Sequence, residues 1–372
     1  MNDSLVLTGH GLRHSGGIER YLLTLIGNLH QRGIRPTVVT HNFDTTLPEY
    51  GWVDPLRVHT SILGGALRDR WFDHRLRLLK ARHGWYPVIA LSQTAAADIA
   101  ICGGTHPGYL AAINKTAGWQ DKLAIALERR HLQGAAVVIA HSRLMADQVQ
   151  QFYGVPAERV QVLYPPVDTQ RFQPVPDSQR RALRERLGLP TDKAVFLLAS
   201  TGHARKGLDL LVGALGHAEL PVLLVVAGRP VAVQAPNLRY LGYRNDIEDI
   251  YRAVDCTVMA SSYEPFGLVG VESVLCGTPL IGAQGMGCME VLQGDAVLPF
   301  KLTASPGQAD GLGAAITTAL ARWRAGQLRV ADARAALRYD PSVAVHVDAL
   351  LGWVDRLRAA RQRPAESTAA SA

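Results

Sequence analysis

Short, unbroken runs of aliphatic and β-branched residues recur along the chain, each followed by a longer segment with apolar residues at helical spacing. In the first half these runs lie at 4–9, 37–41, 88–92, 136–142 and 160–164, and in the second at 194–200, 221–228, 256–261 and 279–283. Strands without polar alternation are covered on both faces, and strands that alternate with helices form parallel sheets. The sequence therefore predicts an α/β protein with doubly wound parallel sheets.

A segment rich in proline and polar residues, 164–179, separates the two sets of strands. Such a composition is typical of a domain linker, and 372 residues are enough for two domains. We expect a first Rossmann-like domain over 1–170 and a second over 171–345, facing each other across a cleft. Residues 346–360 are expected to form a helix that returns to the first domain, and the low-complexity tail 361–372 is expected to be disordered.

The charge and the cysteines limit the classes of protein. A net charge of +7 suits an anionic partner, which could be a nucleotide phosphate, an anionic lipid headgroup or a nucleic acid. The cysteines, Cys102, Cys256, Cys276 and Cys288, show no zinc-ligand spacing and no paired pattern, so they are expected to be reduced and buried. Without a signal sequence or a long apolar run, the protein is expected to be cytoplasmic and at most peripheral on a membrane.

Two strand ends are followed by a glycine-containing loop and a helix. After Gly16 and Gly17, apolar residues fall at helical intervals up to Gly33. In the second half, Arg205 and Lys206 stand just before a helix that should begin near residue 207. Adjacent cations at a helix N-terminus form a site for a pyrophosphate, although a solvated basic helix start would give the same pattern.

Two carboxylates stand in an otherwise apolar, glycine-interrupted segment. Glu264 lies in a predicted loop, and Glu272 lies about one turn inside a helix predicted over 268–276. Both can face one cleft from different depths. A carboxylate within the helix can accept both hydroxyls of a ribose, and one in the loop can bind a sugar or stabilise positive charge at an anomeric carbon.

These segments together resemble the retaining glycosyltransferases of family 4, which have the GT-B fold. Residues 251–282 resemble the E-x7-E signature of that family, 14–40 its glycine loop and first helix, 137–174 the end of its first domain, and 204–215 its donor-phosphate loop. The resemblance extends from residue 15 to about residue 290. It implies transfer of a hexose from a nucleotide-diphosphate sugar, with a UDP-sugar as the expected donor.

Carried over residue by residue, the resemblance implies that Glu272 binds the nucleotide ribose and that Glu264 contacts the donor sugar. Arg205 and Lys206 would neutralise the diphosphate. The other implied donor-binding residues are Gly16, Gly17, Pro265, Phe266, Gly267 and Leu268.

The resemblance also implies a catalytic histidine in the first domain, His106, which follows the two glycines of segment 100–112. A structural histidine is the alternative. Arg143 is a further candidate for a phosphate contact. Thr201 stands where many relatives have an arginine, so the chain is closer to the lipopolysaccharide-core branch, and the donor base stays undecided.

The sequence has no DxD motif at a strand end, so we expect no metal and no cofactor, and arginine, lysine and helix dipoles would hold the diphosphate. The acceptor is expected to be a glycan or a lipid-linked sugar of lipopolysaccharide core or cell-surface polysaccharide synthesis. The basic, aromatic segment 66–86 is expected to lie on the anionic inner face of the cytoplasmic membrane, although Arg68, Arg75 and Arg82 interrupt its apolar side. A solvated surface helix is the alternative.

Other functions have less support. An NAD-linked oxidoreductase would need a third glycine where His14 stands and an acidic residue after the strand at 37–41. A phosphorylase would need a pyridoxal-phosphate lysine site, which nothing here resembles. A GT-B epimerase remains the main alternative. Only the basic charge supports a nucleic-acid-binding protein, and we expect no nucleic-acid partner.

Overall fold

The computed structural model describes residues 5–60, 64–303 and 307–362. The first domain is built on a parallel sheet in which neighbouring strands follow the order β5-β3-β1-β6-β7-β8-β9. The bounds are β1 Val6–Thr8, β3 Thr37–Thr40, β5 Asp54–Arg57, β6 Val88–Ala90, β7 Ile99–Cys102, β8 Val137–Ala140 and β9 Val160–Val162. A short parallel pair, β2 (Gly11–Leu12) and β4 (Asn42–Phe43), lies beside it.

The second domain repeats this plan with the strand order β12-β11-β10-β13-β14-β15-β16. Its strands are β10 Ala194–Ser200, β11 Val222–Gly228, β12 Leu238–Gly242, β13 Cys256–Met259, β14 Leu280–Ala283, β15 Val297–Leu302 and β16 Ala309–Asp310. All pairs are parallel except β15 with β16. The predicted fold class, two Rossmann-like doubly wound domains, is confirmed.

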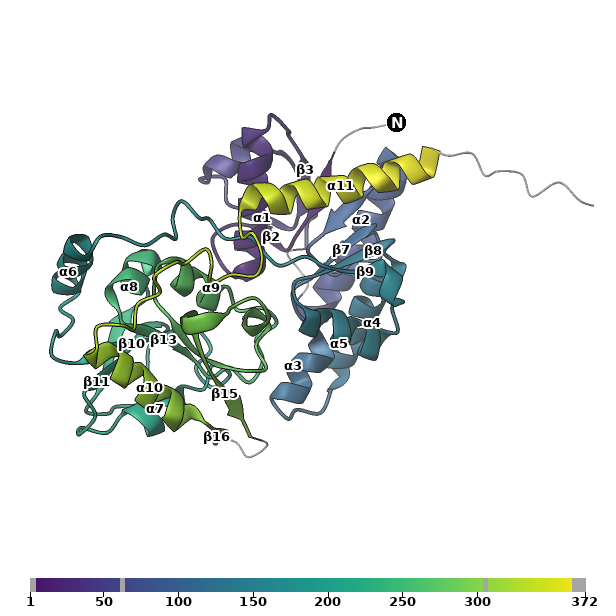
Figure 1. The fold of residues 1–372 in the computed structure, drawn as a ribbon. Coiled ribbons are helices and arrows are strands. Elements are labelled where there is room, and N and C mark those ends of the chain that lie inside the picture. Colours follow the sequence, from purple (N-terminus) through teal and green to yellow (C-terminus); the bar gives the residue numbers. More distant parts are fainter. Residues whose placement is uncertain (1–4, 61–63, 304–306, 363–372) are drawn as a thin grey trace, which may run out of the picture.

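Helices cover both sheets (Figure 1). The helices of the first domain are α1 Gly17–Gln31, α2 Gly65–His83, α3 His106–Ala112, α4 Trp119–Gly134 and α5 Arg143–Tyr153. Those of the second are α6 Asp177–Arg186, α7 Leu208–Leu215, α8 Ile247–Ala253, α9 Leu268–Leu275 and α10 Leu312–Arg324. Short 3₁₀ helices lie at Pro48–Trp52, Ala157–Arg159, Gly287–Glu290 and Gly294–Ala296.

The strands that the apolar runs did not predict lie mostly toward sheet edges. β5 contains Pro55 and is largely exposed, and β12 is only partly covered. β15 alternates buried and exposed positions. Strands near an edge are covered less completely and tolerate proline, so they lack the continuous apolar pattern of a central strand.

The last helix, α11 (Val343–Gln362), leaves the second domain and lies across the first (Figure 1). Val347, Leu350 and Val354 are buried in the core of the first domain. His346 Nε2 lies 2.6 Å from the Tyr21 hydroxyl of α1, so the contact also includes a buried polar pair. Of the tail that we expected to be disordered, 361 and 362 end this helix, and 363–372 lie outside the described residues.

The cysteines are free and buried, as predicted. Within the described ranges, none of the helices is both long enough and apolar enough to span a membrane.

Candidate active site

A cleft of about 540 Å³ lies between the two domains. Chain order reverses between β1 and β6 in one sheet and between β10 and β13 in the other, and ligands of such sheets bind beyond the carboxyl ends of the strands at these points. The predicted donor-binding residues all line this cleft: Gly16, Gly17, Arg205, Lys206, Pro265, Phe266, Gly267, Leu268 and Glu272, together with Glu264. The structure therefore brings the loop at 16–17 together with two segments that lie about 190 and about 250 residues further along the sequence.

The backbone at the start of α9 requires a glycine. Gly267 has φ 94°, and a Cβ at this position would lie 2.9 Å from Glu264 Cγ and 3.3 Å from Cys288 Sγ. The residue therefore lets the loop turn sharply onto the helix without displacing the carboxylate beside it. The N–H groups of Leu268 and Val269, the first two residues of α9, come too early in the helix to find a partner within it, and both residues line the cleft. The amide of Gly270 donates to the carbonyl of Gly267 at 3.0 Å.

The helix α7 starts in the same way. Gly207 has φ 71°, and a Cβ would lie 2.6 Å from the carbonyl oxygen of Ala260. Directly before it, Lys206 is buried and its Nζ donates a hydrogen bond to the carbonyl of Ala199 at 3.0 Å. Burial lowers the pKa of Lys206, and the carboxylate of Glu264 partly opposes this shift. An anion in the cleft would stabilise the charged amine.

The two glutamates lie at different depths, as the sequence predicted. Glu272 is 3% exposed, and its Oε1 lies 2.9 Å from Nη2 of Arg20 on α1. Its Oε2 accepts a hydrogen bond from the Tyr251 hydroxyl at 3.3 Å. Glu264 is nearer the surface, and its Oε2 accepts hydrogen bonds from Arg205 and Ser261, each at 3.2 Å.

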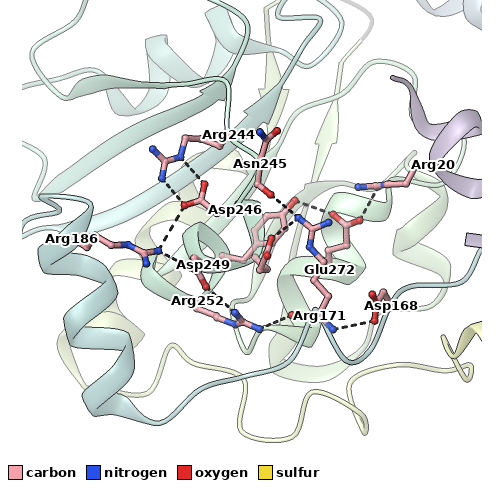
Figure 2. A network of polar contacts seen from close by, with 12 residues as sticks. Arg20, Asp168, Arg171, Arg186, Arg244, Asn245, Asp246, Asp249, Arg252 and Glu272 are labelled. Atoms are coloured by element: carbon pink, nitrogen blue, oxygen red, sulfur yellow. Dashed lines mark hydrogen bonds and ion pairs between the residues drawn. The ribbon is translucent and has the colours of Figure 1, made fainter. Parts of the chain in front are cut away.

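The linker and α8 support the Glu272 side of the cleft (Figure 2). Arg171, in the linker, donates to Glu248 at 2.7 Å and to the carbonyl of Asn245 at 2.8 Å. Arg252 donates in turn to the carbonyl of Arg171 at 2.6 Å. These contacts fix α8, and with it the Tyr251 hydroxyl that touches Glu272.

Contacts between the domains hold the loop that carries Glu264. The amide of Thr105 donates to the Tyr263 hydroxyl at 2.8 Å, and the Ser142 hydroxyl donates to the carbonyl of Pro265 at 2.6 Å. The carboxylate of Glu290 accepts the amide hydrogens of Arg143 and Leu144, at 2.8 and 3.0 Å. A carboxylate of one domain thus caps helix α5 of the other.

The structure places His106 outside the residues that line the cleft. It is the first residue of α3, and its Nε2 lies 2.9 Å from the carboxylate of Asp121 on α4. The hydrogen bond from His106 is the main reason that the pKa of Asp121 falls to about 2. Arg143 also lies outside the cleft lining, at the start of α5. The catalytic role of His106 and the phosphate contact of Arg143 stay predictions.

Sequence reasoning missed several residues of the cleft. His141, directly after β8, is buried and lines the cleft, and its Nε2 has no hydrogen-bond partner among the described residues. Burial lowers its pKa to about 3, so the ring is neutral at pH 7. Arg20 and Tyr21 were missed because the α1 pattern shows which residues are apolar, whereas the direction of each side chain toward the cleft depends on the second domain.

The protein has two Rossmann-like domains that face each other across a cleft, which is the architecture of the GT-B class of glycosyltransferases. The cleft holds an Arg-Lys pair, two helix N-termini and two glutamates. Residues 15–171 match the family model described as "Glycosyltransferase Family 4", and residues 179–334 match "Glycosyl transferases group 1". The chain is 46% identical to a protein of Burkholderia thailandensis named as a probable transglycosylase, over 93% of this chain and 95% of that one. The protein therefore belongs to the glycosyltransferase family that these two models describe, with a family 4 first domain and a group 1 second domain.

Solved structures agree with the fold. WaaG, described as a glycosyltransferase involved in lipopolysaccharide biosynthesis, superposes with a TM-score of 0.75 at 17% identity, over 95% of this chain and 99% of that one. HepE of Anabaena, in complex with UDP and glucose, superposes with a TM-score of 0.73 at 21% identity, over 95% and 100% of the two chains. Family membership favours a glycosyltransferase over an oxidoreductase or a nucleic-acid-binding protein.

No group of three or more histidine, cysteine, aspartate or glutamate residues that could hold a metal ion occurs in the part of the chain that the structure describes. That the reaction needs no metal stays a prediction.

Proposed function

We propose that the protein is a retaining glycosyltransferase that moves a hexose from a UDP-sugar to a glycan or lipid-linked acceptor of lipopolysaccharide core or cell-surface polysaccharide synthesis. One observation carries this proposal: Glu264, Glu272, Arg205 and Lys206 line a single cleft between two Rossmann-like domains. This set offers carboxylates for the hydroxyl groups of a sugar and a ribose, and cations for the diphosphate between them.

The role that we propose for each of these residues follows from its position in the cleft. Glu272, deep in α9, would accept the ribose hydroxyls, and Glu264, in the loop before it, would contact the transferred sugar. Arg205 and Lys206 would hold the diphosphate together with the free amides at the start of α9. UDP as the donor nucleotide is supported by HepE, which was solved with UDP and glucose.

Departure of the diphosphate leaves positive charge on the anomeric carbon, and attack from the same face would retain its configuration. The cations and the helix N-termini would stabilise the leaving group without a metal ion. Since Glu264 is already engaged by Arg205 and Ser261, we assign it to charge stabilisation and sugar binding rather than to a covalent intermediate.

We also propose that the protein works at the inner face of the cytoplasmic membrane and that α2 contacts the anionic lipid surface. Leu67, Trp71 and Leu78 are exposed on this helix. Arg70 and Arg75 are exposed beside them, so apolar and cationic side chains lie on one surface element.

Thermal stability with UDP-, GDP- and ADP-sugars, measured without metal, tests the donor. A ligand that binds only the folded protein raises its melting temperature, so a selective rise with UDP-sugars is expected. A rise with another nucleotide would change the donor class. Binding of none of them would contradict the proposal, and transglycosylation, the activity in the name of the Burkholderia relative, would be the next function to test. Conversion of the nucleotide sugar without transfer would indicate an epimerase.

A further inference from the structure

Each glutamate of the cleft forms an ion pair with an arginine. Arg205 Nη1 lies 3.2 Å from Glu264 Oε2, and both residues belong to the second domain. Arg20 Nη2 lies 2.9 Å from Glu272 Oε1, but Arg20 comes from α1 of the first domain (Figure 2). The Arg20 side chain is 45% exposed, whereas that of Glu272 is 4% exposed.

The carboxylate that the proposed function assigns to the donor ribose is already paired with Arg20. Oε1 of Glu272 faces Arg20, and Oε2 accepts from the Tyr251 hydroxyl. A ribose that donates both hydroxyls to this carboxylate must replace at least the arginine. The guanidinium then loses its anion inside a cleft that Arg205 and Lys206 also line.

The donor itself brings a new anion for Arg20. Its diphosphate would lie between the ribose and the sugar, in the cleft that Arg20 lines together with Gly16 and Gly17. The planar guanidinium can bind two phosphate oxygens at once, and the Arg20 side chain, which lines the cleft, is nearly half exposed.

We propose that Arg20 is a ligand of the donor diphosphate and that Glu272 holds it in place until the ribose takes over this carboxylate. This inference rests on the proposed function. The exchange keeps both charges paired: the ribose replaces Arg20 on Glu272, and a phosphate replaces Glu272 on Arg20. Because Arg20 belongs to the first domain and Glu272 to the second, the bound donor would then be held by both domains.

The competing explanation is that Arg20 only holds the domains together. The two explanations predict different changes in UDP affinity for Arg20→Ala. If Arg20 binds the diphosphate, the variant loses affinity for UDP by about ten-fold or more, while its affinity for uridine stays equal or rises. If Arg20 only holds the domains, removing it frees Glu272, and both ligands bind more tightly or unchanged.

The experiment is calorimetric titration of the full chain with UDP and with uridine. Arg20→Lys, which keeps the charge and loses the planar fork, should lie between the wild type and Arg20→Ala for UDP. The matched control is Arg32→Ala: Arg32 directly follows the last residue of α1 and pairs with Asp348 of α11, outside the cleft lining. This control should leave both affinities unchanged.

A further variant separates this inference from the proposed function. Glu272→Ala should weaken uridine binding, and if it does so while Arg20→Ala leaves UDP affinity unchanged or higher, the function stands and the inference is wrong. If the wild-type protein prefers another base, the matched nucleoside and nucleoside diphosphate of that base replace uridine and UDP. If the wild-type protein binds no nucleoside diphosphate, both the function and the inference are overturned.

Discussion

At the residue scale, the two glutamates differ in burial and therefore in expected role. Glu272→Ala should weaken nucleotide binding by about ten-fold or more, because it removes the buried carboxylate that we propose as the acceptor of the ribose hydroxyls. Glu264→Ala should mainly lower turnover, since we propose that its carboxylate contacts the transferred sugar. Steady-state kinetics together with calorimetric titration separate the two effects. Wild-type values for both variants would show that the site is wrongly assigned.

Buried histidines should make the stability depend on pH. Burial lowers the pKa of His346 from 6.5 to about 4, so the folded state stays neutral where the unfolded chain takes up a proton. Stability is then fully present above pH 6.5 and is lost as the pH falls toward 4, by about 2 kcal/mol at pH 5 for one such histidine.

Urea unfolding at pH 7.5 and 5 measures this loss. His346→Gln should unfold with a smaller difference between the two pH values. His74→Gln, at an exposed position on α2, is the control and should keep the wild-type difference. An unchanged difference in the His346 variant would mean that other groups cause the pH dependence.

At the scale of single elements, the start of α9 depends on Gly267. Gly267→Ala places a Cβ at φ 94° and against Glu264 Cγ, so the folded state should lose about 1–3 kcal/mol and activity should fall with it. Gly285→Ala is a matched control, because a Cβ there meets no atom within 4 Å in the part of the chain that the structure describes. Urea unfolding of both variants tests the difference, and equal stability would show that the loop can adapt to a side chain.

The helix α2 offers a second test at this scale. Arg70→Glu with Arg75→Glu should abolish sedimentation of the protein with vesicles that contain anionic lipid, because two exposed cations become anions. Arg181→Glu with Arg324→Glu makes the same charge change at exposed positions of the second domain and should keep binding. Equal binding by both double variants would favour the solvated surface helix.

At the scale of the whole molecule, α11 fastens the end of the chain to the first domain. Leu350 is 3% exposed in the core of that domain, although it lies more than 180 residues beyond β9. Leu350→Ala should therefore destabilise the first domain by about 2–5 kcal/mol, although the change lies in the last helix of the chain.

The hydrogen exchange of backbone amides in α1 and β1 reports the unfolding of the first domain and would show this loss of stability. Leu351→Ala, at a partly buried neighbouring position, is the control and should cost less. If exchange in α1 did not change, the contact between α11 and α1 would not contribute to the stability of the first domain.

The two parallel sheets could be predicted from the sequence, because a strand buried on both faces needs an unbroken apolar run, as in Val6–Thr8 and Ala194–Ser200. Some cleft residues that follow strands, Arg205, Lys206 and Glu264, were predicted as well. The E-x7-E spacing placed Glu264 in a loop and Glu272 in a helix, and both positions depend only on local chain geometry. Edge strands such as β5 were missed because partial exposure removes the apolar signal.

Which side chains of the first domain reach this site depends on how the two domains pack together. His106 and His141 both follow strands of one sheet, yet His106 pairs with Asp121 while His141 lines the cleft. In the sequence alone, Arg20 looks like any surface residue of an amphipathic helix. In the structure, the second domain places Glu272 within 2.9 Å of it. Local sequence fixes which face of an element is apolar, whereas a contact between domains depends on how two separately folded cores pack.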